Sequence, residues 1–213
     1  MSERAATMLD IAFPVQGGGT LPRAHRSALA AALETALPWL AEEPSVAVHR
    51  LNLSAGGGAL GLLSGRTRLT LRVPRHREAD ARALSGCTLA VAGQALRLGT
   101  GHVRELLPFG TQYAHFVAAA PGAAAEGDEQ LFLDQVQAEL AALGIAGRAI
   151  CGRRQGMQAG DHLAALSGYG LMLDGLQREA ALRLLEAGLG AHRRWGCGVF
   201  VPHKSAAAVG AAH

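Results

Sequence analysis

The sequence has few cysteines, few aromatic residues and no long apolar run. Its three cysteines, Cys87, Cys151 and Cys197, are far apart and form no C-x-x-C pair. This pattern argues against a disulfide framework or a zinc site and indicates reduced thiols. Phe, Trp and Tyr make up 4% of the chain, and the paired-aromatic signature of single-strand RNA readers is missing. We therefore do not expect base stacking to dominate a nucleic-acid contact.

Membrane and export signals are also missing. No stretch of 18 apolar residues occurs, so we expect no membrane-spanning helix and no membrane partner. The first eleven residues contain Glu3, Arg4 and Asp10 and lack the apolar centre of a signal peptide. Together with the cysteines, this predicts a cytoplasmic protein.

Lysine is almost absent, because Lys204 is the only one among 20 basic residues. The formal charge is +3 and the pI is about 9.1. The charge is uneven: net +4 over residues 1–100, −5 over residues 101–143 and +4 over residues 144–213. The two basic ends form a basic face if they meet in space, and the planar arginine fork suits phosphates. Codon bias in a GC-rich genome explains the arginines equally well, so both explanations stay open.

Hydrophobic periodicity over the 213 residues predicts two successive β-α-β-β-α-β units. In the first unit, the expected elements are a strand at 8–15, a helix at 21–40, strands at 46–53 and 67–73, a helix at 74–84 and a strand or hairpin at 88–98. In the second, they are a strand at 111–119, a helix at 128–143, strands at 148–154 and 167–173, a helix at 177–186 and a strand at 197–201. We predict an α+β fold of two tandem ferredoxin-like (RRM-like) domains, residues 1–107 and 108–213.

The most distinctive motif is a glycine-rich loop at residues 188–198, in which two Gly-x-Gly pairs flank a five-residue insert. The four glycines are Gly188, Gly190, Gly196 and Gly198. A dinucleotide fingerprint would need glycine at Arg193 and would open a helix, and a P-loop would need Gly before Lys204, where His203 stands. These mismatches argue against a nucleotide-fuelled enzyme. A glycine helix cap followed by a turn remains an alternative.

This loop pattern resembles the C-terminal glycine-rich loop of the repeat-associated RAMP superfamily. Within it, the chain is similar to the CRISPR repeat-processing endoribonucleases that cut precursor guide RNA, in a compact branch of myxobacterial type. The similar segments are residues 8–15, 21–40, 149–154, 166–173 and 198–205. The resemblance implies the tandem fold and cleavage without metal or cofactor. It also implies as partners the CRISPR repeat RNA, as hairpin precursor and mature guide, and other CRISPR effector subunits.

Cleavage of this kind begins with attack of the ribose 2′-OH on the adjacent phosphorus, and the resemblance implies a 2′,3′-cyclic or 3′-phosphate product. It needs a base, an acid for the leaving 5′-oxygen and donors to the phosphate. His25 is the predicted catalytic residue. It lies in the first turn of the first expected helix, where the helix dipole keeps an imidazole neutral and backbone N–H groups attract phosphate. His25 also lies four residues before Leu29 on the apolar stripe, so a core-capping histidine is the alternative. His49 is the rival. His115 is expected to share a strand face with Tyr113, which by itself assigns it no role.

Basic residues in three places are predicted to bind RNA: beside His25, around a turn expected at residues 156–161, and in the glycine-rich loop. The resemblance implies that a basic hairpin of the second domain grips the repeat stem. The candidates are Arg23, Arg26, Arg148, Arg153, Arg154, His192, Arg193, Arg194 and Lys204. Solvated arginines at strand ends are the alternative.

Two questions remain open from the sequence. Tyr113, Tyr169 and Lys204 are equal candidates for a second catalytic residue. A non-catalytic guide-RNA-binding subunit of a CRISPR effector would keep the same fold, loop and arginines, and an unrelated ferredoxin-like enzyme or regulator is a third possibility.

Overall fold

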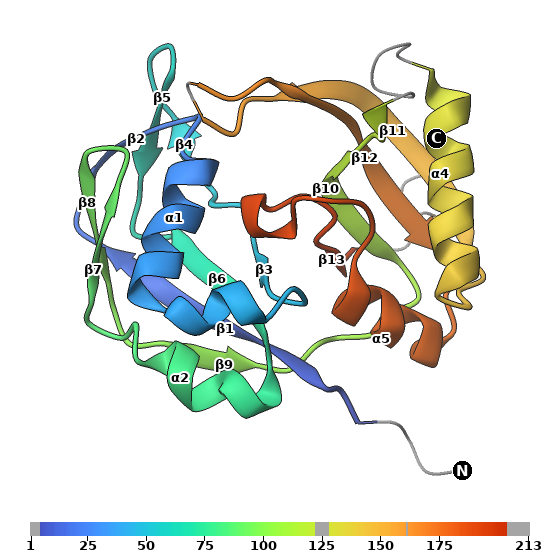
Figure 1. The fold of residues 1–213 in the computed structure, drawn as a ribbon, viewed down its shortest axis with the longest axis horizontal. Helices are drawn as coiled ribbons and strands as arrows, with labels where there is room; N and C mark the ends of the chain where they lie inside the picture. The colour runs from blue at the N-terminus through green and yellow to red at the C-terminus, as the bar shows by residue number, and fades with distance from the viewer. Residues whose placement is uncertain (1–4, 122–127, 161, 204–213) are drawn as a thin grey trace, which may run out of the picture.

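The computed structural model describes residues 5–121, 128–160 and 162–203 (Figure 1). Its described strands form three sheets. The six-stranded N-terminal sheet has the order β3-β6-β1-β8-β7, with β9 also paired to β1. The four-stranded C-terminal sheet has the order β11-β12-β10-β13, and a small sheet has the order β2-β5-β4. The α+β fold class is confirmed.

The N-terminal elements run as far as residue 104. The strands are β1 (Met8–Gln16), β2 (Gly19–Pro22), β3 (Ala47–Val48), β4 (Ser54–Ala55), β5 (Leu60–Leu63), β6 (Arg68–Pro74), β7 (Thr88–Val91), β8 (Gln94–Leu98) and β9 (His102–Arg104). The helices are α1 (Arg26–Ala36), the 3-10 turns η1 (Pro38–Glu42) and η2 (Arg75–Arg77), and α2 (Glu78–Arg82).

Alternation along β1 and β6 builds the N-terminal core. Ile11 of β1 pairs with Leu71 of β6, and both are fully buried. Leu29 and Leu33, one turn apart on α1, join the same cluster. Burying each such side chain stabilises the folded state by roughly 1.5–3 kcal/mol. On one side of β6, Leu69, Leu71 and Val73 are buried; on the other side Arg72 is only 1% exposed.

The C-terminal elements follow the predicted β-α-β-β-α-β order. They are β10 (Gln112–Ala118), α4 (Glu129–Ala142), β11 (Arg148–Met157), β12 (Leu166–Asp174), α5 (Arg178–Ala187), the 3-10 turn η3 (Arg193–Trp195) and β13 (Val201–Pro202). Asp128 caps α4 by accepting hydrogen bonds from the backbone N–H groups of Gln130 and Leu131. Phe132 of α4 stacks on Tyr169 of β12, with ring centroids 4.5 Å apart.

Three expected elements differ from the structure. The first helix begins at Arg26 rather than at residue 21, because residues 19–22 pair with β5 instead, so Pro22 ends a strand. The strand expected at 46–53 is only the two residues of β3. The strand expected at 197–201 is reduced to Val201–Pro202, since Gly198 has φ +62°, which ends an extended backbone.

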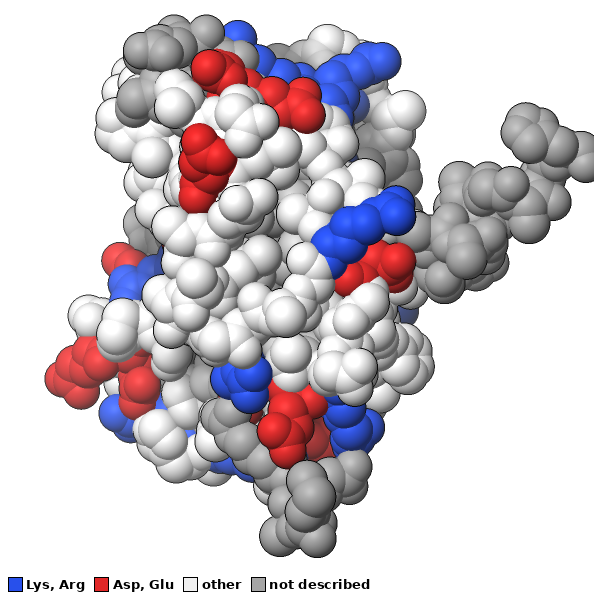
Figure 2. Space-filling model, turned by 90° about the vertical axis from the view of Figure 1, so that its right-hand side faces the viewer, with Lys and Arg blue, Asp and Glu red and all other residues white. Residues whose placement is uncertain are grey.

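The two halves are in direct contact. In Figure 1 the red segment with η3 lies at the centre of the molecule, beside α1 and β3. Arg72 of β6 donates from Nη1 to the backbone oxygens of Leu185 and Phe200, at 2.8 and 3.0 Å. The outer side of the C-terminal half, turned toward the viewer in Figure 2, is largely uncharged at its centre. None of the helices in the described part combines the length and apolar character needed to cross a membrane.

Candidate RNA-binding cleft

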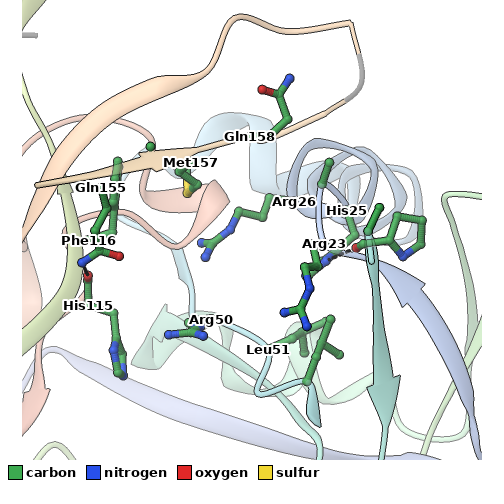
Figure 3. Close-up of a pocket in the computed structure, with 15 residues that line it drawn as sticks. Arg23, His25, Arg26, Arg50, Leu51, His115, Phe116, Gln155, Met157 and Gln158 are labelled. Carbon is green, nitrogen blue, oxygen red and sulfur yellow. Dashed lines mark hydrogen bonds between the residues drawn. The ribbon is translucent and has the colours of Figure 1, made fainter. Parts of the chain in front are cut away.

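A cleft lies between the start of α1 and the C-terminal sheet (Figure 3). Its volume is about 500 Å³. Three arginines and two histidines line it, whereas none of its described lining residues is acidic. Such a concentration of positive charge suits an anionic ligand. The charged and polar residues in the lining are Arg23, His25, Arg26, Arg50, His115, Gln155 and Gln158.

His25 was predicted in the first turn of the helix; it lies at the N-cap of α1, one residue before that turn begins, and lines the cleft. It is 5% exposed, and its Nδ1 lies 2.7 Å from the backbone oxygen of Pro22. A carbonyl oxygen only accepts, so Nδ1 carries a proton and Nε2 of the neutral ring keeps its lone pair. Burial lowers the pKa of His25, and the charge of Arg26 adds to this, against an opposing effect of the Pro22 hydrogen bond. The ring is therefore a neutral proton acceptor near pH 7.

A strand pairing on one side and a backbone hydrogen bond on the other hold His25 in place. Pro22 is fixed because β2 pairs with β5, with Pro22 opposite Leu60. On the other side, the N–H of Ser27 donates to the backbone oxygen of Ala159, at 2.8 Å, in the loop after β11. Sequence analysis predicted that the helix amides near His25 attract phosphate, but the Ser27 amide is already bonded within the protein. The Ser27 amide is therefore not free to bind a phosphate.

The arginines beside His25 differ in their partners. Arg26 donates from Nη1 to the backbone oxygen of Trp195, at 2.6 Å, which joins α1 to the glycine-rich loop. No hydrogen bond or ion pair joins the Arg23 or Arg50 side chain to another described residue, and both line the cleft. Arg50 was not among the predicted RNA-binding residues. Its only signal in the sequence is its position next to His49.

The four glycines of the loop all have positive φ, between +62° and +79°. A Cβ on Gly198 would overlap the backbone oxygen of Leu189, and one on Gly196 would lie 3.1 Å from the backbone oxygen of Val48. The loop therefore packs backbone against backbone, both on itself and on β3. A simple helix cap would explain Gly188, which ends α5, but not these two contacts.

The basic residues in this loop are bound within the protein. Arg193 donates to the backbone oxygens of Ala187 and Glu186 at the end of α5, and burial lowers its pKa to about 10. Arg194 pairs with Glu34 of α1, with the nitrogen and oxygen 2.6 Å apart. His192 is exposed and stacks on Trp195, with centroids 4.7 Å apart. RNA binding by Arg193 and Arg194 stays a prediction, but their contacts favour a structural role.

The arginines of β11 do not form one cluster. Arg148 lies opposite Asp174 in the β11–β12 register at one end of the strand. Arg153 and Arg154 lie toward the other end, roughly 16 Å away at ~3.3 Å per residue. All three are exposed. Only the last two lie near the strand end that reaches the cleft, because β11 continues to Met157. Lys204 lies outside the described residues.

Of the remaining candidate catalytic residues, His49 and Tyr169 are largely buried, whereas His115 lies in the cleft. His49, a rival to His25, is held by Asp10, with Nε2 3.3 Å from Oδ1, and is mostly buried. Tyr169 is in the C-terminal core and is 2% exposed. His115 is exposed in the cleft and lies edge-on to Tyr113, as its place on the same strand face predicted. No group of three or more His, Cys, Asp or Glu in the described ranges is arranged to hold a metal ion.

Comparison with known proteins identifies the family. The family model described as Cas6 Crispr matches residues 9–205. The chain belongs to the Cas6 family. A CRISPR-associated endonuclease Cas6 from Myxococcus xanthus is 33% identical over 201 residues, which are 94% of this chain and 84% of that protein.

Solved structures share the Cas6 fold. A CRISPR associated protein Cas6 has a TM-score of 0.64 at 11% identity and covers 92% of this chain and 100% of its own. A Cas6-related protein from Pyrococcus furiosus has a TM-score of 0.60 at 13% identity, covering 94% and 100%. A CRISPR endoribonuclease Cse3 bound to a 19 nt RNA has a TM-score of 0.52 at 14% identity, covering 94% and 100%. At these identities the likeness concerns the fold.

Proposed function

We propose that this Cas6-family protein is an endoribonuclease that binds the hairpin repeat of precursor CRISPR RNA and cuts it at the base of the stem. The observation that carries the proposal is the His25 ring, whose proton is held on Nδ1 by Pro22 in a cleft lined by arginines. The name of the Myxococcus relative, a CRISPR-associated endonuclease, supports the same activity. The RNA-bound Cse3 structure supports the substrate class.

In the proposed reaction, the 2′-OH at the cut site attacks the adjacent phosphorus and gives its proton to Nε2 of His25. The bond to the 5′-oxygen breaks as that oxygen takes a proton from an acid, which leaves a 2′,3′-cyclic phosphate and a 5′-hydroxyl. Arg23 and Arg50 lie at the cleft wall, with no hydrogen bond or ion pair from their side chains to the described part of the chain, and stabilise the charge that builds up on the phosphate. The reaction needs no cofactor and no metal.

The repeat stem is proposed to lie along the β11–β12 edge. Arg153 and Arg154 are exposed at the end of β11 that reaches the cleft, so a stem bound there brings its base to His25. Proteins contact A-form stems mainly through their shape and phosphates, which suits arginine. Arg148 lies at the far end of the strand and would contact the stem only if the stem extends along the whole length of the sheet.

The test uses the CRISPR repeat from the same genome, 5′-labelled, with excess protein and EDTA. The wild type should make one cut. His25→Asn keeps a donor for the Pro22 oxygen but offers no base at neutral pH, so it should be about 10²–10⁴-fold slower while still binding the RNA. His102→Ala removes an exposed histidine of β9 and serves as the matched control, with unchanged rate.

A non-catalytic guide-RNA-binding subunit is the competing function. Tight binding of the repeat with no cut by the wild type would favour it and refute the nuclease. Cleavage that stops on addition of EDTA would refute the metal-free reaction. Loss of cleavage in His49→Asn, with His25→Asn active, would keep the function but move the base.

A further inference from the structure

The wall of the cleft opposite His25 carries a second histidine. His115 lies on β10 of the C-terminal sheet and lines the main cleft together with His25. It also lines a neighbouring hollow of about 140 Å³, which shares Arg50 with the main cleft. Figure 3 shows His25 and His115 on opposite sides, with the Arg26 and Arg50 side chains between them. A phosphate held by Arg23 and Arg50, the two arginines proposed above to stabilise its charge, would lie between the two imidazoles.

The His115 ring packs against a neighbouring aromatic ring. It lies edge-on to Tyr113, with centroids 5.0 Å apart and planes at 78°. Tyr113 itself is fitted against Gly170, where a Cβ would lie 2.9 Å from the Tyr113 hydroxyl oxygen. No ring nitrogen of His115 hydrogen-bonds to a described residue. The ring is therefore held by packing while its polar atoms can contact a ligand.

We propose that His115 is the general acid of the cleavage reaction, a proposal that rests on the proposed nuclease function. As the 2′-oxygen bonds to phosphorus, Nε2 of His25 takes the 2′-OH proton, and His115 gives its proton to the 5′-oxygen as that bond breaks. The two histidines then return to their starting states by exchange with water, so no further reactant is needed. His25 is the base of the pair because its Nδ1 proton is bound to the Pro22 oxygen, which leaves Nε2 as an acceptor.

The charges around His115 fit a proton donor that works only with RNA bound. Burial lowers its pKa, and the charges of Arg50, Arg26 and His203 add to this. A phosphodiester between the two walls offsets those positive charges and favours the protonated ring. His115 is exposed to solvent, so it can take up the proton from water.

The test compares two RNA substrates under single-turnover conditions. One is the natural repeat, and the other carries sulfur in place of the bridging 5′-oxygen at the cut site. A thiol has a pKa of about 8.5, so sulfur leaves without an acid. His115→Ala should cut the natural RNA about 10²–10⁴-fold more slowly than wild type, and the sulfur RNA less than about tenfold more slowly. His25→Asn should be slow on both, and His102→Ala should match the wild type on both.

The outcomes separate this proposal from the nuclease function. Binding of a 2′-deoxy repeat, which cannot be cut, should be the same in His115→Ala and the wild type. If His115→Ala is equally slow on both substrates, or normal on both, His115 is not the acid although the nuclease stands. If His25→Asn is the variant that sulfur rescues, the two roles are reversed. If the wild type cuts neither RNA, both proposals fail.

Discussion

Replacing Asp10 by Asn should strongly destabilise the protein, because it leaves a buried arginine without its counter-charge. Arg72 donates to Asp10 through two nitrogens, with Nε–Oδ1 at 2.8 Å and Nη2–Oδ2 at 3.0 Å. Its side chain is 1% exposed and that of Asp10 is 15% exposed. Removing one partner of such a buried pair costs about 3–5 kcal/mol. The pKa of Asp10 is consistent with this: burial would raise it, but hydrogen bonds from His49 and Arg72 outweigh that effect and hold it well below its usual range.

Urea unfolding, followed by circular dichroism, measures the loss. With a slope of about 2.5 kcal/mol per M, a loss of 3–5 kcal/mol lowers the midpoint by about 1.2–2 M. Glu105→Gln is the matched control, because it breaks the exposed pair between Arg75 and Glu105 and should cost about 0–1 kcal/mol. Equal shifts in the two variants would refute the reasoning.

A double variant tests which part of the contact matters. Asp10→Leu with Arg72→Met removes both charges, a change that is often neutral for a buried pair. Here the backbone oxygens of Leu185 and Phe200 also lose their donor, at a cost of about 1–3 kcal/mol each. We therefore expect the double variant to remain less stable than the wild type. Full recovery would show that these two hydrogen bonds contribute little.

Three further predictions follow from the loop and the cleft. Gly198→Ala should cost at least about 2 kcal/mol of unfolding free energy, because a Cβ there overlaps the Leu189 oxygen at positive φ, whereas Gly57→Ala, with open space, should be neutral. Arg50→Ala should lower the slope of log affinity against log salt by about 1, measured by filter binding, and an unchanged slope would exclude a phosphate contact. At RNA concentrations below saturation, the cleavage rate of the sulfur-substituted RNA should fall as the pH is lowered, with a midpoint below 6.5, because the base His25 has a lowered pKa. A midpoint above 6.5 would contradict that.

Local patterns in the sequence were enough to predict most elements. The helix at residues 128–143 was placed correctly because it has a capping Asp128 and helical apolar spacing. The second β-α-β-β-α-β order was also predicted correctly. At residues 88–98, where a strand or a hairpin was expected, the structure has a hairpin. We propose residue 107/108 as the domain boundary, because the N-terminal sheet ends at Arg104 and the C-terminal sheet begins at Gln112.

What the sequence could not predict depends on contacts between distant segments. The alternation of β6 placed Arg72 on a polar face, but the C-terminal half covers that face. Arg194 of the loop binds Glu34 of α1, a partner far away in the sequence that the loop motif alone does not reveal. Arg50 was not predicted to bind RNA, because only the assembled cleft distinguishes it from a solvated arginine.

The buried pair and the cleft are parts of one arrangement. His49 and Arg50 are consecutive and follow β3 directly. His49 points inward and contacts Asp10, which also binds Arg72, and Arg72 in turn binds the segment that follows the glycine-rich loop. Arg50 points outward into the cleft. The charge network that joins the two halves therefore also fixes the position of an arginine proposed to hold the phosphate, so weakening it should impair cleavage as well as stability.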